Sequence, residues 1–134
     1  MAKIIFGCGY LGGRVARLWL AQGETVYAVT RSHRRGKQLA AEGMIPLVAD
    51  VAKSAEVPML QRVSTVLFAV GYDRASNLPI HEVYASGVAN AVAWMRNLAD
   101  RFLYISSTGV YGQVAGQVVD EWSPCQPTRD GGKA

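Results

Sequence analysis

Short apolar runs alternate with segments of helical periodicity along most of the chain. Each apolar run predicts a strand, and together they occupy residues 3–6, 25–29, 45–50, 64–70 and 101–106. The fourth run is continuously apolar, which is typical of a strand that is covered by helices on both faces. The pattern therefore predicts a sheet with a buried centre.

Three segments between the runs have the spacing of amphipathic helices. The first follows the first strand and ends at Gln22-Gly23, the second covers residues 35–42, and the third covers residues 80–99 with a broad apolar stripe. Alternating strands and helices predict an α/β fold with right-handed crossovers. We expect a Rossmann-type, doubly wound parallel sheet of five strands in the order 3-2-1-4-5. No regular pattern is found beyond residue 106, and residues 112–134 are rich in Gly and Pro.

Composition supports one ordered domain over residues 1–134, since half of the residues are hydrophobic and 18% are charged. The net charge is +4, and much of the basic excess lies in residues 31–37 without interleaved aromatic residues, so no nucleic-acid partner is expected. We expect no membrane span and no secretory signal, and therefore a cytoplasmic protein. Two cysteines and two isolated histidines have no metal-ligand spacing, so no metal site is expected.

Three glycines, Gly7, Gly9 and Gly12, form a Gly-x-Gly-x-x-Gly motif between the first strand and the first helix. In a dinucleotide site the first allows a tight turn, the second lets the pyrophosphate approach the backbone, and the third lets the helix pack close to the strand. Tyr10 and Leu11 complete this loop, and the helix N-terminus offers N–H groups to phosphate. An ordinary turn without a ligand is the alternative, but the complete βαβ context favours a dinucleotide.

The end of the second strand indicates which dinucleotide is bound. An NAD site usually has Asp or Glu here, to bind the ribose 2′-hydroxyl. This chain has Thr30-Arg31-Ser32 instead. We assign Arg31 and Ser32 to the 2′-phosphate of NADP, with NAD as the alternative cofactor. The basic residues that follow, Arg34, Arg35 and Lys37, are interpreted as a solvated helix face.

The ends of the third and fourth strands should converge on the same ligand, because ligands bind beyond the carboxyl ends of parallel strands. Asp50 and Val51 follow the third strand. Asp50 could accept a hydrogen bond from the adenine amino group, or it could cap a turn. Ala69, Val70 and Gly71 end the fourth strand, where small residues would let the adenine or ribose lie against the backbone.

Residues 104–112, Tyr-Ile-Ser-Ser-Thr-Gly-Val-Tyr-Gly, are similar to a segment of the extended short-chain dehydrogenase/reductase family, which includes nucleotide-sugar epimerases and dehydratases. Residues 120–127 resemble the next loop of that family. Together with the glycine motif, the resemblance covers the whole chain. It implies an NAD(P)-binding oxidoreductase or epimerase that acts on a carbohydrate-like or nucleotide-sugar substrate.

The resemblance also implies catalytic positions. It assigns substrate orientation to Ser107, with Thr108 as a neighbour that could substitute. The family's acid/base Tyr stands four residues before a catalytic Lys. The resemblance assigns Lys133 to that Lys, but Arg129 stands four residues before it. Arginine does not act as a general base, so the match points to an atypical branch unless the alignment is shifted. A non-catalytic dinucleotide-binding scaffold or redox sensor is the second function.

The resemblance implies that this chain corresponds to the N-terminal portion of a longer protein. The family continues with a Lys-bearing helix, a sixth strand and a smaller substrate domain. We therefore expect the chain alone to be inactive. The apolar stripe of residues 80–99 would be partly uncovered, which favours a homodimer through that helix. A small-molecule substrate is the other expected partner.

Overall fold

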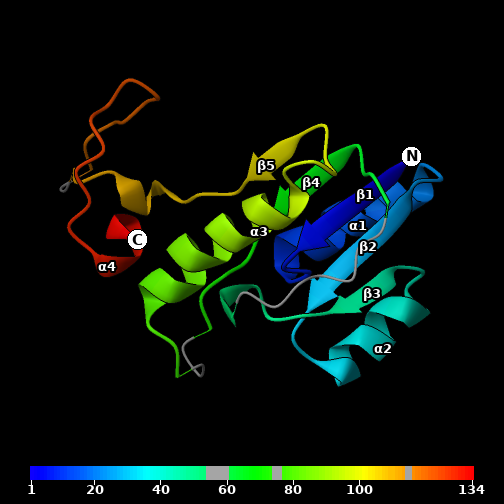
Figure 1. Ribbon diagram of the computed structural model, residues 1–134. Coiled ribbons are helices and arrows are strands. Elements are labelled where there is room, and N and C mark those ends of the chain that lie inside the picture. Colours follow the sequence, from blue (N-terminus) through cyan, green and yellow to red (C-terminus); the bar gives the residue numbers. More distant parts are fainter. Residues whose placement is uncertain (54–60, 74–76, 114–115) are drawn as a thin grey trace.

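A parallel five-stranded sheet forms the centre of the computed structural model, which describes residues 1–53, 61–73, 77–113 and 116–134 (Figure 1). The order β3-β2-β1-β4-β5 confirms the predicted topology. The strands are β1 (Ala2–Phe6), β2 (Thr25–Thr30), β3 (Ile45–Val48), β4 (Thr65–Phe68) and β5 (Phe102–Tyr104). All four neighbouring pairs run parallel.

The last three strands are shorter than their apolar runs predicted. Each keeps one more backbone hydrogen bond to its neighbour, donated by Ala49, Ala69 and Ile105 respectively, before the chain turns away. The residues beyond these positions form loops at the carboxyl edge of the sheet. The apolar runs are therefore longer than the strands because their last residues belong to these loops.

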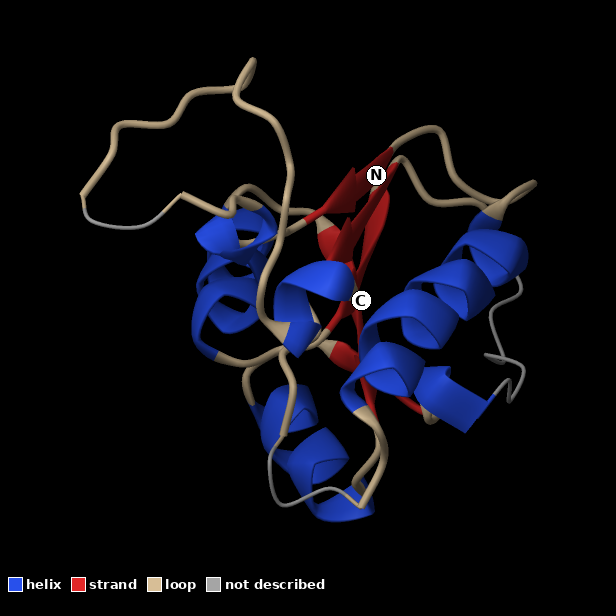
Figure 2. Cartoon of the chain, turned by 90° about the vertical axis from the view of Figure 1, so that its left-hand side faces the viewer, coloured by secondary structure: helices blue, strands red, loops and turns tan. Residues whose placement is uncertain are grey.

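Two helical layers cover the sheet (Figure 2). On one face lie α1 (Tyr10–Ala21) and α2 (His33–Ala41), which contribute Ala16 and Leu39 to a core with Ile5. On the other face lies α3 (Gly87–Met95), which contributes Ala91 and Met95 to a core that also includes Ile4, Phe6 and Phe68. The alternation of Ile4, Ile5 and Phe6 between the two cores follows from the two-residue period of a strand.

The segment predicted as one helix over residues 80–99 is not a regular helix. Helical backbone begins at Ile80, passes through a π-helical turn at Glu82–Ser86, and continues as α3 to Met95. The helix ends early because residues 98–100 pair with Val63: the Val63 N–H donates to Leu98, and Val63 accepts from Asp100. This backbone pairing replaces the last predicted turn.

The prediction that residues 112–134 lack regular structure is wrong in one place. A single turn of helix, α4 (Asp130–Lys133), lies close to the short 3₁₀ turn Thr108–Val110. A Cβ on Gly132 would lie 2.0 Å from the carbonyl oxygen of Gly109, so the two backbones approach very closely. No helix in the described ranges is long and apolar enough to cross a membrane.

Two glycines allow α1 to start directly above β1. Gly7 has a φ of 91°, and a Cβ there would lie 2.5 Å from the carbonyl oxygen of Ala69. A Cβ on Gly12 would lie 2.2 Å from the carbonyl oxygen of Gly7 and 3.1 Å from Ile5 Cγ2. The two shortest of these contacts, to the carbonyl oxygens of Ala69 and Gly7, involve backbone atoms, which have little room to move. The tight turn and the close helix packing predicted for these two glycines are therefore present.

Substitution of Gly12 should destabilise the protein, whereas the adjacent glycine should tolerate a methyl group. We expect Gly12→Ala to lower the free energy of unfolding by about 3 kcal/mol or more, because its Cβ would collide with backbone. A Cβ on Gly13 has only ordinary contacts, the nearest at 3.8 Å, so Gly13→Ala should stabilise the helix by up to about 1 kcal/mol. Urea denaturation of both variants tests this, and equal stabilities would contradict it.

Burial raises the pKa of the Cys8 thiol to about 11, against a smaller opposing effect of the Arg35 guanidinium. The native thiol therefore stays protonated between pH 9 and 11, while the thiol of the unfolded chain ionises. Stability should fall across this interval, by on the order of 2 kcal/mol from Cys8 alone. The stability difference between the parent chain and Cys8→Ala should therefore shrink from pH 8 to pH 11. A constant difference would show that Cys8 does not contribute.

Candidate functional site

The glycine loop forms the floor of the site. Gly9 is the residue before α1, and no side chain caps the helix there. Unlike Gly7 and Gly12, Gly9 has open space where a Cβ would lie, with no atom within 4 Å. Packing within the described part of the chain therefore does not explain why this position is glycine. The missing side chain leaves the start of α1 accessible.

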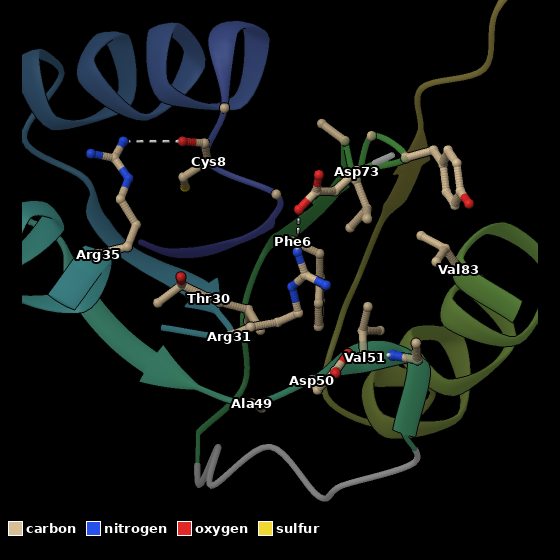
Figure 3. Close-up of a pocket in the computed structure, with 18 of the residues that line it drawn as sticks. Phe6, Cys8, Thr30, Arg31, Arg35, Ala49, Asp50, Val51, Asp73 and Val83 are labelled. Carbon is tan, nitrogen blue, oxygen red and sulfur yellow. Dashed lines mark hydrogen bonds and ion pairs between the residues drawn. The ribbon is translucent and has the colours of Figure 1, made fainter. Parts of the chain in front are cut away.

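A cleft of about 400 Å³ opens above the carboxyl ends of β1 to β4 (Figure 3). Most of the predicted cofactor-binding residues line it, namely Gly7, Gly9, Arg31, Asp50, Val51, Ala69, Val70 and Gly71. They come from four different strand ends, which the parallel sheet brings to one edge. The wall is largely apolar, with the two arginines Arg31 and Arg35 at one side.

A second cleft of about 420 Å³ lies beside the first, above β4 and β5. Ala69, Val70 and Gly71 line both clefts, so the two are neighbours across the end of β4. Leu11 and Ser107 belong to the second cleft. The predicted site residues that line neither cleft are Tyr10, Gly12, Ser32, Thr108 and Lys133.

Arg31 and Ser32 have different positions at the end of β2. Arg31 lines the first cleft, and its Nη2 lies 3.3 Å from Oδ2 of Asp73 in an ion pair. The hydroxyl of Ser32 instead accepts a hydrogen bond from the backbone N–H of Arg35 and caps the start of α2. Serine is a preferred residue at this position of a helix, which explains its presence without a ligand.

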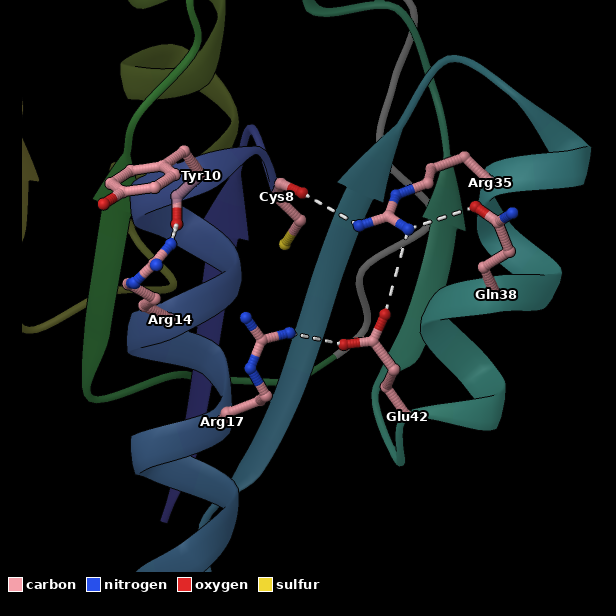
Figure 4. Close-up of polar contacts among 7 residues, drawn as sticks. All are labelled: Cys8, Tyr10, Arg14, Arg17, Arg35, Gln38 and Glu42. Carbon is pink, nitrogen blue, oxygen red and sulfur yellow. Dashed lines mark hydrogen bonds and ion pairs between the residues drawn. The ribbon is translucent and has the colours of Figure 1, made fainter.

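The interpretation of Arg35 as part of a solvated helix face is wrong. Its guanidinium lies against the glycine loop and donates to the carbonyl oxygen of Cys8 at 3.2 Å (Figure 4). It also donates to Gln38 at 3.1 Å and lies 3.8 Å from a carboxylate oxygen of Glu42. Arg35 is four residues before the fully buried Leu39 and so shares its helix face. That spacing was the signal that could have placed Arg35 at the site.

An ion-paired network fixes the position of Arg35. Glu42, just past the end of α2, bridges Arg35 and Arg17, and the Arg17 contact is 2.8 Å long. Arg17 lies on α1, so the network joins α1, α2 and the glycine loop (Figure 4). The guanidinium of Arg35 is therefore held beside the loop by acceptors from three directions.

Asp50 adopts the second of its two predicted roles. Its Oδ1 accepts a hydrogen bond of 3.1 Å from the backbone N–H of Ala52 and so caps the 3₁₀ turn Val51–Lys53. Asp50 still lines the first cleft, half-buried, so the remaining carboxylate oxygen lies near a ligand space. The two roles are compatible in this geometry.

At the second cleft, Ser107 is exposed and its hydroxyl accepts from the backbone N–H of Gly109 at 3.3 Å. A hydroxyl that accepts in this way retains its own proton for donation. Arg129 precedes α4, and Lys133 lies at the exposed end of that turn. The structure thus brings Ser107 to the cleft, while Thr108 and Lys133 lie outside it.

Two tyrosines that the sequence interpretation did not include connect the clefts. The backbone N–H of Tyr72 donates to the hydroxyl of Tyr84 at 3.1 Å, and the two rings are 6.4 Å apart. Tyr72 lines the first cleft, and Tyr84, on the π-helical turn, lines the second. The irregular turn was the missing signal, since a regular helix over residues 80–99 gave no reason to single out Tyr84.

Comparisons with known proteins agree with this geometry. The chain matches the family model described as "NAD dependent epimerase/dehydratase family" over residues 4–130. A search among curated proteins finds no significant match. A structure of a functionally unknown conserved protein from Silicibacter pomeroyi DSS is 26% identical, with a TM-score of 0.72 over 98% of this chain and 44% of that one.

Two further solved structures share the fold at lower identity. ChuY, described as an anaerobillin reductase from Escherichia coli O157:H7, is 17% identical with a TM-score of 0.60, over 83% of this chain and 53% of that one. The protein gox2253 is 19% identical with a TM-score of 0.71, over 93% and 40%. This chain therefore spans about half the length of the structures that it matches, or less.

The family match includes nearly all of the chain, from within β1 to the start of α4. The predicted strand order and the glycine loop are both present. This chain belongs to the NAD-dependent epimerase/dehydratase family.

Proposed function

We propose that the chain binds NADP(H) across its two clefts and forms the cofactor-binding part of a reductase or epimerase. The substrate class that we propose is a carbohydrate-like or nucleotide-sugar alcohol or carbonyl compound. Family membership supports a nicotinamide dinucleotide as the cofactor. The bound cofactor would supply hydride transfer, while the residues of this chain bind and orient it.

The observation that carries the proposal is the open space at Gly9. Gly7 and Gly12 are needed for packing, but among the residues that the structure describes Gly9 has no neighbour that would exclude a side chain. A pyrophosphate that lies against the loop would explain the glycine, because it needs close access to backbone N–H groups. The uncapped N-terminus of α1 supplies such groups and a partial positive charge.

The two clefts suit the two halves of a dinucleotide. The first, above the ends of β1 to β4, would take the adenosine half, and the second, above β4 and β5, the nicotinamide half. Ala69, Val70 and Gly71, which line both clefts, would lie beneath the junction. Ser107 would then be on the nicotinamide side, where its hydroxyl could orient a substrate carbonyl or alcohol.

Two arginines support NADP rather than NAD. Arg31 and Arg35 both line the adenosine side of the first cleft, and no carboxylate stands among residues 30–32 at the end of β2. A guanidinium binds phosphate through paired, charge-assisted hydrogen bonds. The position of Arg35 adds a second cation to the one that the sequence assigned to this phosphate.

Arg129 favours a second candidate function, a non-catalytic dinucleotide-binding module or redox sensor. This residue precedes α4 at the place where the family resemblance expects the acid/base tyrosine. Arginine retains its proton at neutral pH and does not serve as a general base. The cofactor-binding experiments below apply to both functions, since both require the dinucleotide.

Gly9→Val tests the glycine loop. The added side chain would occupy the open space above the loop, so NADPH binding should weaken by more than about tenfold, or about 1.4 kcal/mol. The fold should persist, because no protein atom lies within 4 Å of the new Cβ. Calorimetric titration and circular dichroism measure the two effects, with Gly13→Ala as the matched control that should bind normally. A folded Gly9→Val variant with parental affinity would show that the loop is not the phosphate site.

Parallel titrations with NADPH and NADH test the choice of cofactor. We expect the parent chain to bind NADPH more tightly. Arg31→Gln should cost NADPH on the order of 1.5–3 kcal/mol through loss of a charge-assisted contact and should leave NADH nearly unchanged. Arg62→Gln is the control, since this exposed arginine pairs with Asp100 at the opposite end of the strands and changes the charge equally. Equal affinities for the two cofactors in the parent chain would rule out the preference.

A further inference from the structure

We propose that Asp73 sets the affinity for the 2′-phosphate of NADP(H) by holding the guanidinium of Arg31 when that phosphate is absent. The inference rests on the proposed function, because it takes Arg31 as the phosphate-binding residue. It assigns a specificity-determining role to a carboxylate on a different strand end from Arg31.

The Arg31–Asp73 ion pair joins the ends of two strands that are not neighbours in the sheet. Arg31 follows β2 and Asp73 is in the loop after β4, while β1 lies between these two strands in the sheet. The contact of 3.3 Å between Nη2 and Oδ2 therefore crosses the carboxyl end of β1, where the glycine loop begins (Figure 3). Both residues line the first cleft. The carboxylate thus reaches Arg31 from a strand end on the other side of β1.

The pair lies at the rim of the cleft, since the side chains of Arg31 and Asp73 are 49% and 52% exposed. An ion pair with this exposure is weak and exchanges readily. A phosphate carries more charge than a carboxylate and can accept two parallel hydrogen bonds from one guanidinium. The 2′-phosphate should therefore displace Asp73, but at the cost of the existing pair. NADH has a hydroxyl at this position and leaves the pair intact, so the competition affects NADPH alone.

Arg35 provides an internal comparison. Its guanidinium is also held by an acidic residue, Glu42, at 3.8 Å. Glu42, however, is shared with Arg17 and does not line the first cleft, whereas Asp73 does. Of the two acid partners, Asp73 is the one that stands within the proposed ligand space. It is therefore the residue whose charge should compete with the phosphate.

The test is the substitution Asp73→Asn, with NADPH and NADH titrated separately at low and high salt. NADPH should bind roughly two- to fivefold more tightly than to the parent chain, the range that an exposed ion pair supports. NADH binding should not change. The gain should vanish in an Arg31→Gln background, and it should shrink at about 0.5 M salt because exposed charges are then screened. Asp100→Asn is the matched control, an exposed aspartate paired with Arg62 far from the cleft, and it should change neither affinity.

The inference would be overturned by no gain for NADPH, by an equal gain for NADPH and NADH, or by the same gain without Arg31. Weaker NADH binding in Asp73→Asn would also overturn it, because Asp73 would then be holding the ribose hydroxyls. Failure of the proposed function has a different signature. It would appear in the parent chain, as no preference for NADPH or no binding of either cofactor, before any change at Asp73.

Discussion

The fold is built around the close approach of α1 to β1. The carbonyl oxygen of Gly7 lies 2.2 Å from the position that a Cβ on Gly12 would take, and Gly7 itself lies directly against the backbone of Ala69. These contacts join the central strand, the first helix and the end of β4 in one small volume. They also leave the N-terminus of α1 at the carboxyl edge of the sheet, with Gly9 open above it. The same packing that stabilises the fold therefore positions the loop on which the proposed function depends.

The sequence predicted those parts of the fold that depend on local pattern. Apolar runs and the glycine motif were sufficient to predict five parallel strands, their order and the tight turn at Gly7. The π-helical turn and the early end of the third helix were not predicted, because both depend on tertiary contacts such as the backbone pairing of Val63 with residues 98–100. Likewise, α4 is a single turn that packs against residues 108–110, and a turn of this length has no periodicity to detect.

In the candidate site, too, the features that depend on local pattern were predicted and those that depend on tertiary contacts were not. Gly7, Gly9 and the residues that end β3 and β4 line the first cleft because strand topology determines where they lie. Polar and charged side chains were harder to place. Ser32 has a capping hydrogen bond, Arg35 turns inward beside Leu39, and Asp73 reaches Arg31 from a strand end 42 residues further along the chain. A polar or charged side chain can reach several alternative partners once the backbone is formed, so a sequence pattern seldom identifies the partner.

The central position of β1 also affects how the chain folds. On one side Lys3 pairs with Val26 of β2, but on the other side it pairs with Thr65 of β4, so the second pairing closes a far longer segment of chain. Closing a longer segment costs more conformational entropy and is slower. We therefore expect β1, α1 and β2 to associate first and β4 to pair with β1 later. Until then, one edge of β1 is unpaired. During synthesis β1 leaves the ribosome before β4, so its unpaired edge is exposed to misassociation with other chains until β4 has been made.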